Sequence, residues 1–197
     1  MRRIGRALLL VVALVLLGTA DALIWGYREL RGSLAQLDGP RQLAGLTAPV
    51  TVTRDRFGIP TIRAANRLDA ARATGFLHAQ DRFFEMDLLR RRAAGELSAL
   101  IGPAPLTVDR EIRIHRFRDE ARRVVALLNP ADRAVIDAYV EGVNAGLRAL
   151  DSPPFEYLAI RATPAPWTAE DCFLVVLSMF VTLQDSDGSH ESTLATM

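Results

Sequence analysis

The 197-residue sequence predicts a mostly helical fold with one short β-hairpin. Three patterns predict it: two short alternating segments around a turn, apolar residues spaced three or four apart over longer segments, and helix-start signals before those segments. Half of the residues are hydrophobic, which allows a sizeable core and excludes a wholly disordered chain. The 24 basic residues nearly cancel the 23 acidic ones, so the composition argues against a nucleic-acid-binding protein.

The N-terminal segment, residues 1–25, has the order of a secretory signal peptide. Three arginines precede an apolar run over residues 7–17, and small residues surround Asp21. The alternative is an uncleaved membrane anchor over residues 7–25, since this length approaches a bilayer span. Either interpretation predicts that the bulk of the chain is periplasmic or otherwise extracytoplasmic. Residues 26–48 are polar without a strong period and are expected to form a linker.

The hairpin is the first element expected in the region 49–197. Residues 50–53 alternate between apolar and polar, a turn-like segment follows at 55–58, and Pro60 in the next segment favours an edge position.

Helices are expected in the rest of this region. From about Leu68 the pattern is helical, and Gly102 and Pro103 end it. The apolar residues on one stripe of this helix are Phe83, Met86, Leu89, Ala93, Leu97 and Leu100. Asn129 and Pro130 begin a second helix that ends before Pro153. A third starts after Thr168, and because residues 173–183 are apolar on nearly every side, this helix is expected to be buried all round.

Few residues suggest chemistry by their spacing alone. His78 with Asp81 or Glu85 could be a metal or acid–base site, but metal-binding helices usually place ligands four apart, and His78 has an arginine there. Ion pairs along this helix, such as Asp87 with arginines three and four residues later, are the better interpretation. No nucleophile with a general base can be assembled, and the single cysteine, Cys172, is expected to be packed and unreactive.

An acidic cluster around Gly188 offers the oxygen ligands that calcium prefers. It does not match the twelve-residue calcium loop, so a partial calcium site and a solvated turn both remain open.

Several motifs occur in a specific order: residues 52–64, residues 79–86, Arg90-Arg91, a Y-x-x-G-x-N-A segment at 139–145, and a P-W-x-x-x-D segment at 166–171. With them the sequence resembles the penicillin acylase (penicillin amidase) family, from about residue 49 to residue 197. The matching region is the α-subunit of the precursor.

The resemblance implies an αββα N-terminal nucleophile hydrolase fold that a β chain of the same precursor completes. It implies a precursor that cuts itself, hydrolysis of an amide bond in a small N-acyl substrate, and a nucleophilic serine that begins the β chain. No catalytic residue is therefore expected in this sequence. The resemblance also implies that the Asp81-Arg82 and Arg90-Arg91 pairs hold the α chain on the β chain.

The resemblance further implies which residues of this chain face the substrate and a structural calcium ion. Met179 matches an acyl-pocket residue, whereas Thr182 and Leu183 replace an arginine–aromatic pair of the penicillin G enzymes, so an aliphatic acyl chain is at least as plausible as the penicillin G side chain. Glu191 matches the calcium ligand, with Asp185 and Asp187 as weaker candidates. β-Lactams, acyl-homoserine lactones and acylated peptides all remain open as substrates.

Two other classes of protein remain. One is a non-catalytic, membrane-anchored binding module of the same fold, and the other is a calcium-dependent exported structural protein. A serine at the start of a β chain would separate the acylase from both.

Overall fold

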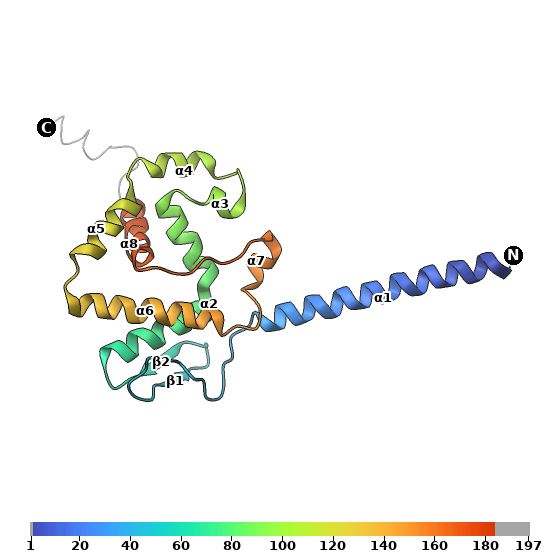
Figure 1. The fold of residues 1–197 in the computed structure, drawn as a ribbon, viewed down its shortest axis with the longest axis horizontal. Coiled ribbons are helices and arrows are strands. Elements are labelled where there is room, and N and C mark those ends of the chain that lie inside the picture. The colour runs from blue at the N-terminus through green and yellow to red at the C-terminus, as the bar shows by residue number, and fades with distance from the viewer. Residues whose placement is uncertain (1, 184–197) are drawn as a thin grey trace.

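The computed structural model describes residues 2–183, without the side chains of residues 2–9, 181 and 182. Helix α1 stands apart from the other elements, which pack together (Figure 1). The elements run in this order: α1 (Arg2–Gly32), β1 (Thr51–Arg54), β2 (Pro60–Arg63), α2 (Arg67–Ala94), α3 (Ser98–Ile101), α4 (Leu106–Arg113), α5 (Phe117–Leu127), α6 (Pro130–Arg148), α7 (Phe155–Ile160) and α8 (Ala169–Leu183). The prediction of a mostly helical fold with a short hairpin is confirmed.

Helix α1 extends further than the sequence suggested. It continues to Gly32 without a break, so residues 26–32 are helical and the irregular connection to the hairpin starts later than expected. Its end lies against the segment after α6, where the Ser152 amide donates to the Gly32 carbonyl at 3.1 Å. Within it, residues 10–32 are long and apolar enough to cross a membrane, a test that a signal sequence near the N-terminus also passes.

The hairpin has the expected antiparallel register, with Val52 opposite Ile62. Its turn is fixed by the Asp55 carboxylate, which accepts hydrogen bonds from the amides of Phe57 and Ile59 at 2.8 and 2.9 Å. Gly58 in the same turn has a positive φ of 79°, a conformation that glycine adopts at no steric cost.

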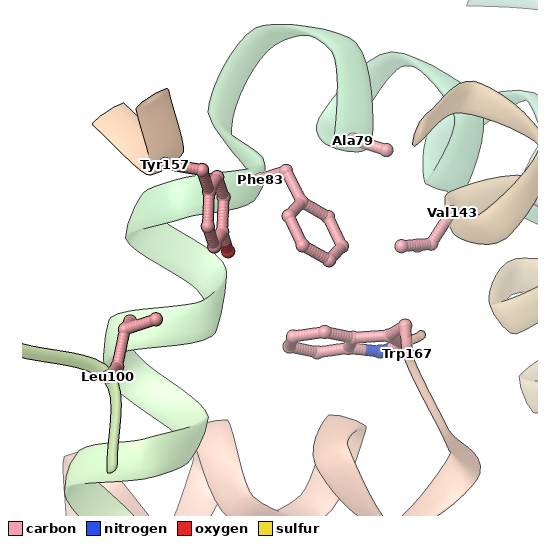
Figure 2. Packing of buried hydrophobic residues seen from close by; sticks show 6 residues of the cluster. All are labelled: Ala79, Phe83, Leu100, Val143, Tyr157 and Trp167. Atoms are coloured by element: carbon pink, nitrogen blue, oxygen red, sulfur yellow. The ribbon is translucent and has the colours of Figure 1, made fainter. Parts of the chain in front are cut away.

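The core forms where α2 and α6 pack against each other. Phe83 of α2 lies among Val143 of α6, Tyr157 of α7 and Trp167 of the segment before α8 (Figure 2). The two helices approach closely at three glycines, at each of which a Cβ atom would overlap a backbone carbonyl oxygen of the opposite helix: Gly75, Gly142 and Gly146.

The prediction of one helix up to Gly102 was wrong. Helix α2 ends at Ala94 because Gly95 takes the left-handed conformation, with φ of 68°, and its amide bonds to carbonyls of the last turn. Residues 98–101 form the separate helix α3. Helix α2 also contains a kink at Arg82, whose φ and ψ are −150° and 25°.

Candidate functional site

The exposed side of α8 carries two of the three residues assigned to the acyl pocket. Met179 and Leu183 are 63% and 76% exposed, and Val176 and Phe180 extend the same apolar surface. Their spacing of three and four residues places these four residues on one side of the helix; we call them the α8 apolar face. The side chain of Thr182 lies outside the described residues.

Residues 2–183 alone therefore do not bury α8 all round. Leu174 and Ser178 are buried, whereas Val176, Met179 and Leu183 are more than 60% exposed among the described residues. Phe180 is 49% exposed, because its ring packs edge-on against Phe117 of α5 at 6.3 Å between centroids. Exposed apolar patches of this kind mark interaction or ligand-binding surfaces. Whether Met179 and Leu183 contact an acyl group stays a prediction.

A chain of hydrogen bonds fixes the segment that leads into α8, residues 165–168. Arg90 donates to the carbonyls of Ala165 and Pro166 at 2.9 and 2.8 Å. The side-chain amide of Asn144 accepts a hydrogen bond from the backbone N–H of Trp167 and donates one to the backbone carbonyl of Trp167, each at 2.8 Å. Asp171, in the first turn of α8, accepts from the backbone and the hydroxyl of Thr168 at 2.8 and 2.9 Å.

Arg90 also forms two buried ion pairs. Its guanidinium contacts the carboxylates of Asp87 at 2.7 Å and Asp171 at 2.6 Å, and both acids are almost completely buried. Asp87 additionally accepts from Arg91 at 2.8 Å and from the Tyr157 hydroxyl at 2.6 Å. The predicted pairs of Asp87 with Arg90 and Arg91 are confirmed.

These partners all belong to this chain, and a role of the Arg90-Arg91 pair in holding the α chain on a β chain stays a prediction. Burial disfavours the charged form of Arg90, but Asp171 and Asp87 outweigh burial and raise its pKa. Burial, followed by the hydrogen bond to Asp87, raises the pKa of the Tyr157 hydroxyl. Arg90 is thus charged and Tyr157 neutral at physiological pH.

His78, Asp81 and Glu85 each have a different partner and do not converge on one site among the described residues. His78 contacts the Tyr139 hydroxyl at 2.9 Å, Asp81 binds Arg54 at 2.8 Å, and Glu85 binds Arg82 at 2.9 Å. Burial lowers the pKa of the His78 imidazole, and Asp81 opposes that effect. Among residues 2–183 there is no group of three or more His, Cys, Asp or Glu side chains placed to hold a metal ion. Ion pairs, the interpretation favoured by spacing, therefore describe this stretch.

The predicted calcium ligands cannot be placed. Glu191, Asp185 and Asp187 all lie outside the described residues. A structural calcium ion held by Glu191 stays a prediction.

An open groove of about 810 Å³, which the sequence reasoning missed, lies beside the hairpin turn. Its walls come from four segments: residues 31–37, 54–60, 80–85 and 154–156. Asp81 ties the hairpin to α2 through two hydrogen bonds from Arg54, at 2.8 and 2.9 Å. Only the assembled fold reveals this groove, because its walls are far apart in the sequence.

Cys172 is packed as expected, with its sulfur 3.3 Å from the Trp167 indole nitrogen. Burial raises the pKa of the thiol to about 11. At pH 8 the thiolate fraction is then about a hundredfold or more below that of an ordinary cysteine with a pKa of about 8.5.

We therefore expect Cys172 to react with iodoacetamide at pH 8 about a hundredfold more slowly in the folded protein than after unfolding in guanidinium. Mass spectrometry over a time course measures both rates. Equal rates in the folded and unfolded protein would show that the thiol is reactive and that its packing does not protect it.

With this geometry described, the chain can be compared with known proteins. Residues 49–197 match the family model described as penicillin amidase, so the chain belongs to the penicillin amidase family. The resemblance inferred from the motifs is confirmed.

The chain is 41% identical over 138 residues to penicillin acylase 2 proenzyme of Pseudomonas sp. (strain SE83), covering 70% of this chain and 18% of that protein. It is 33% identical over 161 residues to the acyl-homoserine lactone acylase QuiP of Pseudomonas aeruginosa, covering 81% of this chain and 19% of that protein. Among solved structures it resembles a thermostable penicillin G acylase from Alcaligenes faecalis, with a TM-score of 0.64 and 30% identity over 71% of this chain and 76% of that one. The chain thus spans about a fifth of the length of these curated relatives.

Proposed function

We propose that this chain is the α-chain part of an acylase that hydrolyses the amide bond of an N-acyl substrate. The observation that carries the proposal is the match of residues 49–197 to the penicillin amidase family. Relatives named as penicillin acylases and acyl-homoserine lactone acylases support amide hydrolysis as the reaction.

In this proposal the remainder of a longer precursor forms the β chain and supplies the nucleophilic serine at its N-terminus. The serine attacks the amide carbonyl, the amine leaves, and water hydrolyses the acyl-enzyme. The α-amino group of the same serine acts as the general base, which replaces the histidine of a classical triad. Residues 2–183 contribute no group to the proton transfer.

The proposed contribution of this chain is one wall of the acyl pocket. The α8 apolar face supports this role, because apolar side chains dominate ligand pockets and because Val176, Met179 and Leu183 are more than 60% exposed in this chain. Met179 and Leu183 are the residues that we assign to the wall. The aliphatic side chains of Met179 and Leu183 favour an aliphatic acyl group, because burying apolar surface against them stabilises the complex without a hydrogen bond.

We expect the full precursor to hydrolyse N-acyl substrates and Leu183→Phe to shift its preference toward shorter acyl chains, because a ring shortens the pocket. One methylene in an apolar pocket changes kcat/KM about 10- to 200-fold. The measurement is relative kcat/KM across acyl-homoserine lactones and penicillins of increasing chain length, with self-cleavage followed by gel electrophoresis.

Leu127→Phe is a matched control, since Leu127 is 84% exposed at the end of α5. A precursor that matures and hydrolyses none of these amides contradicts the proposed function. An unchanged chain-length preference in Leu183→Phe contradicts the pocket assignment alone.

We propose in addition that helix α1 directs export and serves as a signal peptide or an anchor. Its apolar residues are exposed from residue 10 onward, as a segment in contact with lipid requires. We expect a mature chain that starts near residue 23 if the helix is cleaved, and one that keeps Met1 and sediments with membranes if it is an anchor. An uncleaved precursor that remains soluble in the cytoplasm would contradict export.

A further inference from the structure

We propose that Arg90 and Asn144 are positioning residues that set the placement of α8 and, through it, the acyl-chain preference of the enzyme. The inference rests on the proposed function, since it takes Met179 and Leu183 as part of the acyl pocket. Neither Arg90 nor Asn144 belongs to the α8 apolar face, so both act through α8.

The first step is that the path into α8 is held at every residue by these two side chains and by Asp171. Arg90 binds the carbonyls of residues 165 and 166, Asn144 binds both backbone groups of Trp167, and Asp171 binds Thr168. Asp171 is itself paired with Arg90 at 2.6 Å. One guanidinium thus fixes both the segment before α8 and the first turn of the helix.

The second step is that this arrangement requires an arginine. Arg90 is buried, with 4% of the residue exposed. All three nitrogen atoms of its guanidinium donate hydrogen bonds, to acceptors on α2, on the backbone of residues 165 and 166, and on α8. The guanidinium also lies over the Trp167 ring, 5.0 Å from the centroid. A lysine carries its donors on one nitrogen at one point and cannot reach these acceptors together.

The third step is that a small change in the tilt of α8 at its start displaces the far end of the helix by a larger distance. A helix rises about 1.5 Å per residue, so Leu183 lies about 18 Å along the axis from Asp171. A tilt of about 3° at Asp171 then moves Leu183 by about 1 Å, close to the length added by one methylene. Since one methylene changes specificity markedly, acyl-chain preference is a sensitive readout of the placement of α8.

The test uses Arg90→Lys and Asn144→Ala in the full precursor. The readout is the ratio of kcat/KM between long and short N-acyl substrates for the matured protein, normalised to the amount of reactive serine. We expect this ratio to change at least fivefold in both variants. Asn144→Ala leaves the buried ion pairs in place, and so it keeps the inference testable if Arg90→Lys does not fold.

Asp109→Ala is the matched control, because it removes the buried hydrogen bonds from the Leu97 and Ser98 amides, at 2.9 and 2.7 Å, and these bonds involve neither residues 165–168 nor α8. We expect it to lower the melting temperature and leave the ratio unchanged. A purely structural role predicts that all three variants lose active protein at a constant ratio, and that result overturns the inference.

The two proposals fail in different ways. If Leu183→Phe changes the ratio while Arg90→Lys and Asn144→Ala do not, the positioning inference is overturned and the proposed function stands. If none of the variants changes the ratio, Leu183→Phe included, the pocket assignment is overturned and the positioning inference with it.

Discussion

Replacing Arg90 with leucine in the full precursor lowers the free energy of unfolding by about 3–5 kcal/mol, the loss expected when one partner of a buried ion pair is removed. Two carboxylates, of Asp87 and Asp171, then remain buried without their cation. The carbonyls of residues 165 and 166 also lose their donor. Leucine fills much of the volume of the apolar part of the Arg90 side chain. The lost free energy of unfolding therefore comes more from the uncompensated buried carboxylates than from a cavity.

Arg123→Leu is the matched control. Arg123 pairs with Glu120 at the same three-residue spacing on α5, but its side chain is 72% exposed. Exposed pairs contribute about 0.2–1 kcal/mol, so this variant should unfold almost as the parent does. Urea unfolding followed by circular dichroism measures both variants. Equal midpoints for Arg90→Leu and Arg123→Leu would show that the buried pairs contribute no more than surface ones.

Local patterns in the sequence predicted the starts of α6 and α8 correctly. Asn129 accepts from the Asp132 amide at 2.9 Å at the start of α6, and α8 starts directly after Thr168. Caps are predictable because the capping side chain and the amide that it satisfies lie within one turn of each other. The hairpin register follows for the same reason, since a short turn fixes it.

The interior of α2 could not be predicted, because its buried side is set by distant partners. The expected apolar stripe included Leu89, which is 41% exposed, while Asp87 and Arg90 are buried. Charged residues occupy buried positions here because Asp171 and Tyr157, far along the sequence, satisfy them. The assumption that apolar residues are buried and charged residues are exposed fails wherever distant side chains satisfy a buried charge.

The burial of α8 cannot be derived from its own sequence pattern. An apolar helix has the same sequence pattern whether its partner surface belongs to its own chain or to another, so the pattern does not identify what covers it. Leu174 is covered by this chain and Met179 is not. The relatives are about four times as long as this chain and carry further chain outside the matched part.

Three of the five motifs that carry the family resemblance come together in the structure at one place. Arg90, Asn144 and the 166–171 segment are far apart in the sequence and meet at the start of α8. The motif spacing could not show this, because each motif was matched separately. Residues of these three motifs therefore supply the contacts on which the proposed placement of α8 depends.

Gly142→Ala should disrupt the packing of α2 against α6, because the added Cβ atom would overlap the Arg72 carbonyl oxygen. A backbone carbonyl cannot rotate away as a side chain does, so the helices must separate along the core around Phe83. Overpacking costs about 1–3 kcal/mol when side chains can adjust, and we expect at least about 3 kcal/mol here.

Gly26→Ala in α1 is the control. Its added Cβ atom meets nothing within 4 Å, and alanine in place of glycine within a helix favours folding by up to about 1 kcal/mol. The melting temperature of the full precursor is the measurement. A Gly142→Ala variant that melts with the parent would show that α2 and α6 do not approach as closely as this structure places them.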